Sequence, residues 1–382
     1  MPDFELERYY YPVLEHCAYL DASTTGAIPQ YTCDAMQSYL ARRTRNGMGI
    51  KAYLEDWDFA ERVRSEIGVM INCAPENLAF GASQASVQSI FFDNIPIEDG
   101  DNVVTYETAF PSSIHPWLYR KDEGVETRIA KAEDGAVPAQ SLFDLVDERT
   151  RAVVVCHVDN MTGYRHDLQA IGEFCRSKDI PFAVDATQSC GALQIDVEEM
   201  KIDFLSTSTY KWLLNVHGLG FAYISRKLMN RLGMKNVGWA GVKDHSKVNN
   251  LLLNLSPDAQ RYEQGGLNFM ALRGLSSVIR NYMRLGGIPV EEQVLRLVDY
   301  TYKSLKGIKG VSVFGDFPPQ HRSGIVMVNF PEAWDLNNAV LAEHGIRAGV
   351  AGSRIRLGIH FYNNTADIDR FTDFLKKCAA KK

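Results

Sequence analysis

The chain has 382 residues, of which 46% are hydrophobic and 23% charged, which is the composition of an ordinary soluble globular protein of two or three domains. Its net charge of −6 leaves no large basic field, and this argues against a nucleic-acid partner. No apolar run approaches the roughly 18 residues of a membrane span, so we expect no membrane partner.

The N-terminal residues and the cysteines indicate the compartment. The opening segment, MPDFELERYYYP, is acidic and aromatic and lacks the basic and apolar regions of a signal peptide. The seven cysteines are widely spaced and include no C-x-x-C pair, so neither a zinc finger nor a redox dithiol is indicated. We therefore expect free thiols in a reducing cytoplasm.

The first motif along the chain is a loop of small residues, Gly81-Ala82-Ser83-Gln84, between an apolar segment and a helical pattern. Such a turn is usually a helix cap. It is also a ready anion site, because a helix N-terminus presents free N–H groups. The loop alone does not decide between these two interpretations.

The middle of the chain alternates strand and helix patterns. Short apolar runs predict strands at 152–158, 180–186, 202–209 and 218–225, and the spacing of apolar residues predicts a helix over 167–178. This alternation is typical of a mostly parallel sheet with helices on both faces, which is an α/β fold. Because such sheets bind ligands at the carboxyl ends of their strands, Asp185, at the end of its run, is a candidate site residue.

The C-terminal half is more mixed. A polar stretch over 235–262 predicts a surface excursion or a domain junction. A helical pattern over 267–285 then continues into 290–308, and further strands and helices follow. Residues 366–378 predict a final helix whose apolar stripe faces a core.

Common catalytic motifs are missing from the sequence. It contains no G-x-G-x-x-G after a strand, no G-x-x-x-x-G-K-[ST], no H-E-x-x-H and no G-x-S-x-G. No metal site is indicated. Dinucleotide, P-loop, zinc and serine-hydrolase chemistry are therefore disfavoured.

Two residues together with the small-residue loop indicate one cofactor. Asp185 by itself would usually be a cap or turn residue, and Lys211, between Tyr210 and Trp212, would usually be a lysine whose stem lies on apolar surface. Together, a desolvated lysine can form a Schiff base, and an aspartate can hold a pyridinium nitrogen protonated. With a helix N-terminus for the phosphate, these are the requirements of pyridoxal 5'-phosphate.

The same region resembles the class-V aminotransferases, the group that includes cysteine desulfurases and isopenicillin-N-epimerase-like proteins. The resemblance is carried by VDATQSCGALQIDV followed by DFLSTSTYKWLLNVHGLGFAYIS. It extends over nearly the whole chain through YLDASTTGAIP, AFGASQASVQSI, YETAFPSSIHPW, CHVDNMTGYRHDL, RYEQGGLNFMALRGL and RIRLGIHFYNNTADIDRF. It implies the fold-type-I architecture of pyridoxal-phosphate enzymes, with a large domain around a mostly parallel sheet and a smaller α+β C-terminal domain.

The resemblance implies roles around the cofactor ring. Lys211 would carry the cofactor and move the proton at the substrate α-carbon. Asp185 would pair with the pyridine nitrogen, and Gln188 would hydrogen-bond the phenolic oxygen, with Asn160 close to the ring. Phe110 would stack on the ring face, where many similar proteins carry His.

It also implies a phosphate site. Ala82, Ser83 and Ser208 would bind the phosphate. Tyr210 stands where similar proteins usually carry His, and it can still hydrogen-bond. Gly266 stands where a Thr from the partner subunit often reaches the phosphate, so only its backbone can contact the cofactor.

On the substrate side, Arg356 would pair with the α-carboxylate of an amino acid, because a planar guanidinium suits that anion. A surface arginine on an edge strand is the alternative. We expect Arg354 to point to the opposite face of its strand. The loop 347–354 lacks the nucleophilic cysteine that desulfurases carry there, and Cys378 is the nearest cysteine in sequence, so persulfide chemistry on an enzyme thiol is not expected.

The expected enzyme is therefore a cytoplasmic pyridoxal-phosphate protein acting at the α-carbon of an amino acid. Transamination and β-elimination, such as that of a C–S lyase, both stay open, with epimerisation or a catalytically silent scaffold as alternatives. The resemblance further implies a homodimer with the active site at the interface. The expected division is an N-terminal arm over 1–15 that packs with the small domain, a large domain over 16–260 and a small domain over 261–382.

Overall fold

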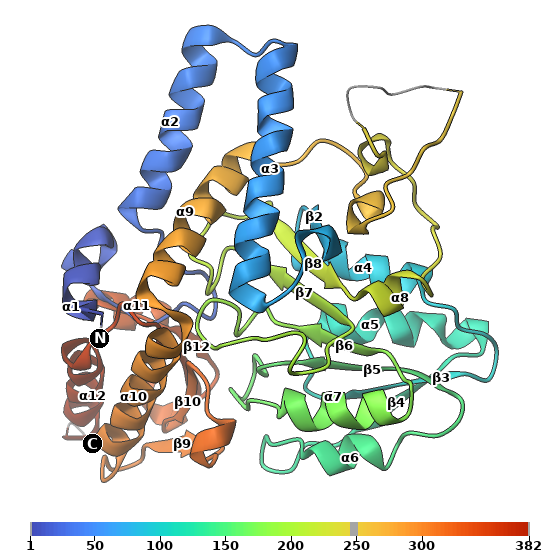
Figure 1. Ribbon diagram of the computed structural model, residues 1–382. Helices are drawn as coiled ribbons and strands as arrows, with labels where there is room; N and C mark the ends of the chain where they lie inside the picture. Colours follow the sequence, from blue (N-terminus) through green and yellow to red (C-terminus); the bar gives the residue numbers. More distant parts are fainter. Residues whose placement is uncertain (1, 245–250, 381–382) are drawn as a thin grey trace.

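A seven-stranded sheet lies at the centre of the larger part of the chain in the computed structural model, which describes residues 2–244 and 251–380 (Figure 1). In spatial order its strands are β2 (Leu78–Gly81), β8 (Gly220–Ile224), β7 (Phe204–Ser208), β6 (Phe182–Asp185), β5 (Thr150–Cys156), β3 (Asn102–Tyr106) and β4 (Glu126–Ala130). β8 is antiparallel to both neighbours, and the other pairs are parallel. This confirms the expected α/β fold with a mostly parallel sheet.

Helices cover both faces of this sheet, and alternate strand residues pack against the two layers. On β5, Val153 and Val155 join the core beneath one layer, whereas Ala152 and Val154 join the other. The first layer includes α3 (Ile50–Ile71), α6 (Ala139–Phe143), α7 (Leu168–Ser177) and α9 (Phe269–Leu285). The second includes α4 (Gln84–Asn94), α5 (Pro111–Tyr119) and α8 (Arg226–Met229). Burial on both faces explains why the strands are nearly continuous apolar runs.

A second, antiparallel sheet contains the C-terminal strands. Its order is β12 (Gly349–Ala351), β13 (Arg354–Gly358), β10 (Ile325–Asn329) and β9 (Ser312–Phe314). The helices of this region are α10 (Gly287–Leu305), α11 (Asn338–Glu343) and α12 (Thr365–Ala380). The apolar stripe of α12 is buried in this core, as its spacing predicted.

The region from 235 to 308 differs in detail from its predicted elements. The continuous helical pattern is two helices, because the backbone at Gly286 has φ +83°, which ends α9 before α10 begins. The polar stretch holds two short 3₁₀ turns, Trp239–Gly241 and Ala259–Tyr262, and part of it (245–250) lies outside the described residues.

The N-terminal segment contacts the C-terminal one. It includes α1 (Phe4–Glu7) and β1 (Ala18–Tyr19), and β1 pairs in parallel with β11 (Ile346–Arg347). Arg8 donates hydrogen bonds to Asp367, at 2.8 Å, and to the carbonyl of Tyr362. Both chain ends therefore lie at the same side of the molecule (Figure 1). The domain boundaries after residues 15 and 260 stay a prediction.

Helices α2 (Gln30–Asn46) and α3 form an antiparallel pair that projects beyond the sheet (Figure 1). A fully buried carboxylate joins them to α9: Asp56 accepts hydrogen bonds from Tyr39 at 2.9 Å and from Arg273 at 2.6 Å. Within the part of the chain that the structure describes, no helix has both the length and the apolar character needed to cross a membrane.

A buried ion pair connects α3 to the segment that precedes α9. Arg64 and Glu263 are each about 1% exposed and pair directly. Glu263 also accepts a hydrogen bond from the Phe80 N–H at 2.8 Å, and Arg64 donates to the carbonyl of Leu78. The pair thus holds the segment around residue 263 against β2, the strand that leads into the small-residue loop.

Removing one partner of this pair should be costly, because it leaves a buried charge without its counter-charge. We expect Arg64→Met to lower the free energy of unfolding by about 3 kcal/mol. The double variant R64M/E263M should recover most of that loss. Urea unfolding measures both.

Lys376→Ala is the control, because Lys376 and Asp373 form a pair whose side chains are 57% and 60% exposed. We expect a change below about 0.5 kcal/mol for this variant. A loss in R64M no larger than that in K376A would contradict a stabilising role for the buried pair.

Candidate active site

Three neighbouring strands bring their carboxyl ends together at one edge of the large sheet. Cys156 at the end of β5 lies opposite Asp185 on β6, and Asp185 lies opposite Ser206 on β7. The loops that follow carry Asn160, Gln188 and Lys211 respectively. Parallel strand order therefore gathers residues that are separated by up to about 50 positions in sequence.

These loops enclose a cavity of about 250 Å³. Most of the residues expected at the site line it: Lys211, Asp185, Gln188, Ser83, Phe110, Asn160, Ser208 and Tyr210. Ala82 and Gly266 are not brought into this cavity, and Arg356 reaches it through a contact with Asn160.

The amine of Lys211 is held away from water. The residue is only 8% exposed, and its Nζ lies 5.7 Å from the centre of the Phe110 ring and 5.8 Å from that of Tyr210. Burial lowers the pKa of this amine to about 8, although the nearby carboxylate of Asp185 partly opposes the effect. At pH 7 about a tenth of the amine is therefore uncharged, against less than roughly a thousandth for an ordinary lysine, and the uncharged form is the nucleophile toward an aldehyde.

Asp185 is the buried acid of the site. Its carboxylate accepts a hydrogen bond from the Thr187 N–H at 2.9 Å and one from the Ser113 hydroxyl at 3.4 Å. Burial raises the pKa of this carboxyl, and the Thr187 hydrogen bonds and the positive charge of Lys211 oppose that shift. A buried carboxylate facing a cavity is well placed to hold a cationic ring nitrogen.

The loop between β2 and α4 forms a capped helix N-terminus beside the cavity. The hydroxyl of Ser83 accepts from the Ser86 N–H at 3.2 Å, and the Ser86 hydroxyl accepts from the Ser83 N–H at 2.9 Å. The Gln84 N–H donates to the Ser208 hydroxyl at 3.1 Å. The N-terminal turn of α4, together with Ser83 and Ser208, is therefore a fitting cradle for a phosphate.

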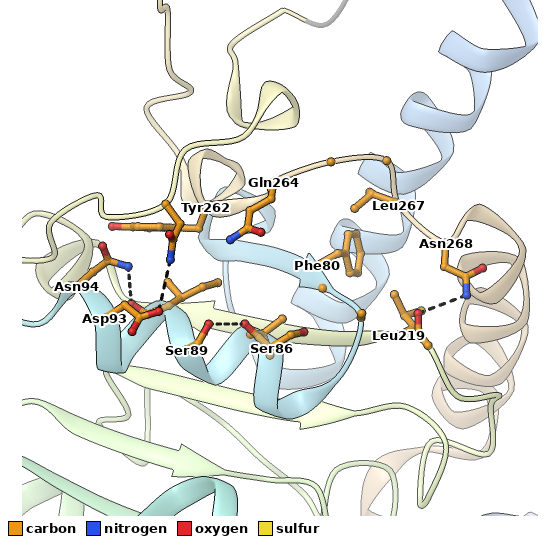
Figure 2. A pocket seen from close by; sticks show the side chains of 18 residues that line it. Phe80, Ser86, Ser89, Asp93, Asn94, Leu219, Tyr262, Gln264, Leu267 and Asn268 are labelled. Atoms are coloured by element: carbon orange, nitrogen blue, oxygen red, sulfur yellow. Dashed lines mark hydrogen bonds between the residues drawn. The ribbon is translucent and has the colours of Figure 1, made fainter. Parts of the chain in front are cut away.

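A second cavity, of about 400 Å³, lies on the other side of this loop (Figure 2). Ala82 and Gly266 line it, together with Tyr262, Gln264 and Asn268. The picture shows α4 along one wall and the segment from Tyr262 to Asn268 along the other. Ala82 and Ser83 face different cavities because successive residues of an extended segment point in opposite directions.

Arg356 connects the small sheet to the site. From β13 its guanidinium donates to the carbonyl of Asn160 at 3.2 Å and to the hydroxyl of Thr24 at 2.7 Å. Burial lowers the pKa of Arg356, and the carboxylate of Asp21 opposes this shift. A guanidinium at the edge of the cavity that donates these two hydrogen bonds to neutral oxygens is suited to a substrate carboxylate.

The expected direction of Arg354 was wrong. Residues two apart on a strand share a face, and Arg354 and Arg356 are both half-buried, whereas Ile355 between them is fully buried. Arg354 is kept from the cavity by its place further along the strand, where it lies 4.0 Å from the Phe314 ring centre and bonds to Asn329.

Gln188 is fixed through both ends of its amide. It donates to the carbonyl of Ser23 at 3.1 Å and accepts from the indole N–H of Trp212 at 2.8 Å. This leaves one N–H of the amide for a further acceptor. The side-chain carbonyl oxygen of Asn160 is buried without a hydrogen-bond partner in the described structure.

Several residues of the site were not found from the sequence. Cys156 lines the floor of the cavity, where burial raises the pKa of its thiol to about 12. Thr24, Gln84 and His217 also contribute to the site or line it. All four lie in motifs that carried the resemblance, Cys156 as the first residue of CHVDNMTGYRHDL, so position within a motif was the available signal.

Comparison with known proteins agrees with this geometry. The sequence profile described as "Aminotransferase class-V" matches residues 18–371. The chain belongs to the class-V aminotransferase family. Enzymes of this family use pyridoxal phosphate and act at the α-carbon of amino acids.

Individual relatives are distant in sequence but match this chain over most of their length. A "Probable cysteine desulfurase" of Methanothermobacter thermautotrophicus is 26% identical over 96% of both chains. An "Uncharacterized aminotransferase" of Schizosaccharomyces pombe is 28% identical over 85% of this chain and 83% of that protein. The apo cysteine desulfurase of Thermococcus onnurineus has the same fold, with a TM-score of 0.89 at 22% identity over 100% and 99% of the two chains. The cystine C-S lyase C-DES gives 0.87 at 18% identity over 96% and 99%.

The residues present fit the family's cofactor. The unpartnered carbonyl oxygen of Asn160, the buried carboxylate of Asp185 and the hydroxyl-lined turn at Ser83 are the polar groups that a phosphorylated pyridine aldehyde requires. Lys211 supplies the amine.

The pKa of Lys211 predicts how fast the cofactor-free protein reacts with pyridoxal. Below pH 8 the amine is protonated, so the rate should fall about tenfold per pH unit, and it should level off above pH 8. Absorbance changes at several pH values measure this rate. Lys211→Ala gives the background from other lysines, and a midpoint near 10 in the wild type would contradict the burial effect.

Proposed function

We propose that this enzyme removes the α-proton of a small amino acid and expels its β-substituent, as a C–S lyase does. The observation that carries this proposal is the lack of a reactive cysteine thiol that could accept sulfur from the substrate, within the described residues that line the cavity. Cys156 is the cysteine among the described residues that line the cavity, and its buried thiol, with a pKa of about 12, is a poor nucleophile. The loop 347–354 contains none. A sulfur atom would therefore leave with the departing group and not pass to an enzyme thiol.

The residues at the cavity support a division of roles in this reaction. The bound cofactor supplies an electron sink for the charge that develops at the α-carbon. Arg356 binds the substrate carboxylate, and the Lys211 amine takes the α-proton. Asp185 keeps the ring nitrogen protonated, and Phe110 covers one ring face. The N-terminus of α4, with Ser83 and Ser208, holds the phosphate, whereas Ala82 and Gly266 line the neighbouring cavity.

Transamination is the second candidate. Lys211 is the one amine lining the described cavity, and it is sufficient to move a proton from the α-carbon to another carbon without any leaving group. Two relatives are named as uncharacterized aminotransferases. Relatives and fold neighbours named as desulfurases or a C–S lyase support chemistry at a C–S bond.

A product screen distinguishes these reactions. With cysteine, β-elimination consumes water and yields pyruvate, ammonia and hydrogen sulfide in equal amounts. We expect this outcome, and we expect no persulfide on the enzyme. A keto acid that forms only with an amino acceptor would establish transamination, racemised substrate would establish epimerisation, and no turnover of any amino acid would indicate a silent scaffold.

The proposed pairing of Arg356 with the substrate carboxylate predicts that its removal changes KM. Arg356→Gln should raise KM for the amino acid about tenfold or more, because a charge-assisted pair to the carboxylate is lost, and it should leave cofactor absorbance unchanged. Arg354→Gln is the matched control on the same face of the same strand. Equal effects of the two variants on KM would refute the carboxylate role of Arg356.

We also propose a cytoplasmic homodimer with the active site at its interface. Exposed apolar side chains support association: Leu252, Leu253 and Ile50 are 66%, 62% and 74% exposed. The seven free cysteines support a reducing compartment.

A further inference from the structure

The phosphate cradle has almost no positive charge of its own. Ser83, Gln84 and Ser208 are neutral, and of the described residues that line the cavity only Lys211 and His217 can be cationic. Lys211 is needed for attachment of the cofactor. A phosphate monoester carries a charge of about −1.5 to −2 near pH 7, so a helix N-terminus of about +0.5 leaves most of it uncompensated.

His217 lies on a loop that is held against this cradle. The loop follows Lys211 and leads into β8, whose first residue, Gly220, pairs with Gly81 at the end of β2. A Cβ added at Gly220 would lie 2.6 Å from the carbonyl carbon of Ser83, so the two segments are in close contact.

The other side of the loop is also fixed. Gly218 has φ +89°, a conformation that favours glycine, and its carbonyl accepts a hydrogen bond from Asn268 at 3.3 Å. Figure 2 shows this bond beside Leu219. The loop therefore presents His217 from a backbone that is tied on both sides.

The ring of His217 has a defined position. It stacks on the ring of Tyr210 with centroids 3.8 Å apart and an angle of 18° between the planes. Tyr210 directly precedes Lys211 and lines the same cavity. An imidazole that stacks in this way keeps both ring nitrogens at its edge, free of the ring contact and available to an anion.

We propose that His217 is the cationic counter-ion of the cofactor phosphate and that Tyr210 orients it by stacking. The inference rests on the cofactor assignment above, and it is independent of which reaction follows. In this role His217 would strengthen the binding of a phosphorylated ligand and would not affect the binding of the same ring without its phosphate.

The test measures dissociation constants of the cofactor-free full chain for pyridoxal phosphate and for pyridoxal, which lacks the phosphate. We expect His217→Gln to weaken pyridoxal phosphate about tenfold and to leave pyridoxal unchanged, because one charge-assisted contact is lost. His217→Lys should restore part of the affinity. Tyr210→Leu, which removes the stack, should weaken pyridoxal phosphate in the same selective way.

His115→Gln is the matched control, an exposed histidine on the neighbouring helix α5, and it should change neither constant. Equal affinity of H217Q and wild type for pyridoxal phosphate would overturn the proposal. So would an equal loss for both ligands, which would indicate a structural role. Failure of the wild type to bind either ligand would instead refute the cofactor assignment itself, before any variant is compared.

Discussion

The desolvation of one amine is the constraint on which the site depends. An exposed lysine would stay protonated at neutral pH and could not attack an aldehyde. Lys211 is buried, with its amine 5.7 Å and 5.8 Å from the ring centres of Phe110 and Tyr210, and burial lowers its pKa to about 8. The sheet makes this burial possible, since both of its faces are covered and its strand ends close around the cavity. Asp185 limits the shift and keeps the amine within the useful range.

The sequence was sufficient for the parts of the site that follow directly from strand patterns. Asp185 ends an apolar run, and Lys211 follows the next one, so a parallel sheet was enough to predict that they meet. Cys156 shows the limit of such reasoning. Proximity in sequence directed attention to Cys378 as the cysteine nearest the 347–354 loop, whereas the register of β5 and β6 places Cys156 in the cavity floor. Distances across a sheet depend on strand order, which a single sequence does not specify.

The small-residue loop shows a second limit of prediction from the sequence, because a motif does not specify where each side chain points. Ala82 and Ser83 are neighbours, and the resemblance implied the same role for both, yet they face separate cavities. Gly266 lines the cavity of Ala82, and a Cβ there would meet nothing within 4 Å. The direction of each side chain at the end of β2 is a property of the local backbone. The end of α9 at Gly286 is a further example of a local backbone effect. The apolar periodicity continues past this glycine, but its positive φ ends the helix.

The contact between Arg356 and Thr24 joins residues that are 332 positions apart. Thr24 therefore leaves the ribosome long before Arg356. The groups that would hold the cofactor are already present when β8 has been synthesised, but the carboxylate clamp is complete only with β13. A nascent chain that ends between β8 and β13 would therefore contain the cofactor residues and lack the carboxylate clamp, so catalysis cannot begin before β13 has been synthesised.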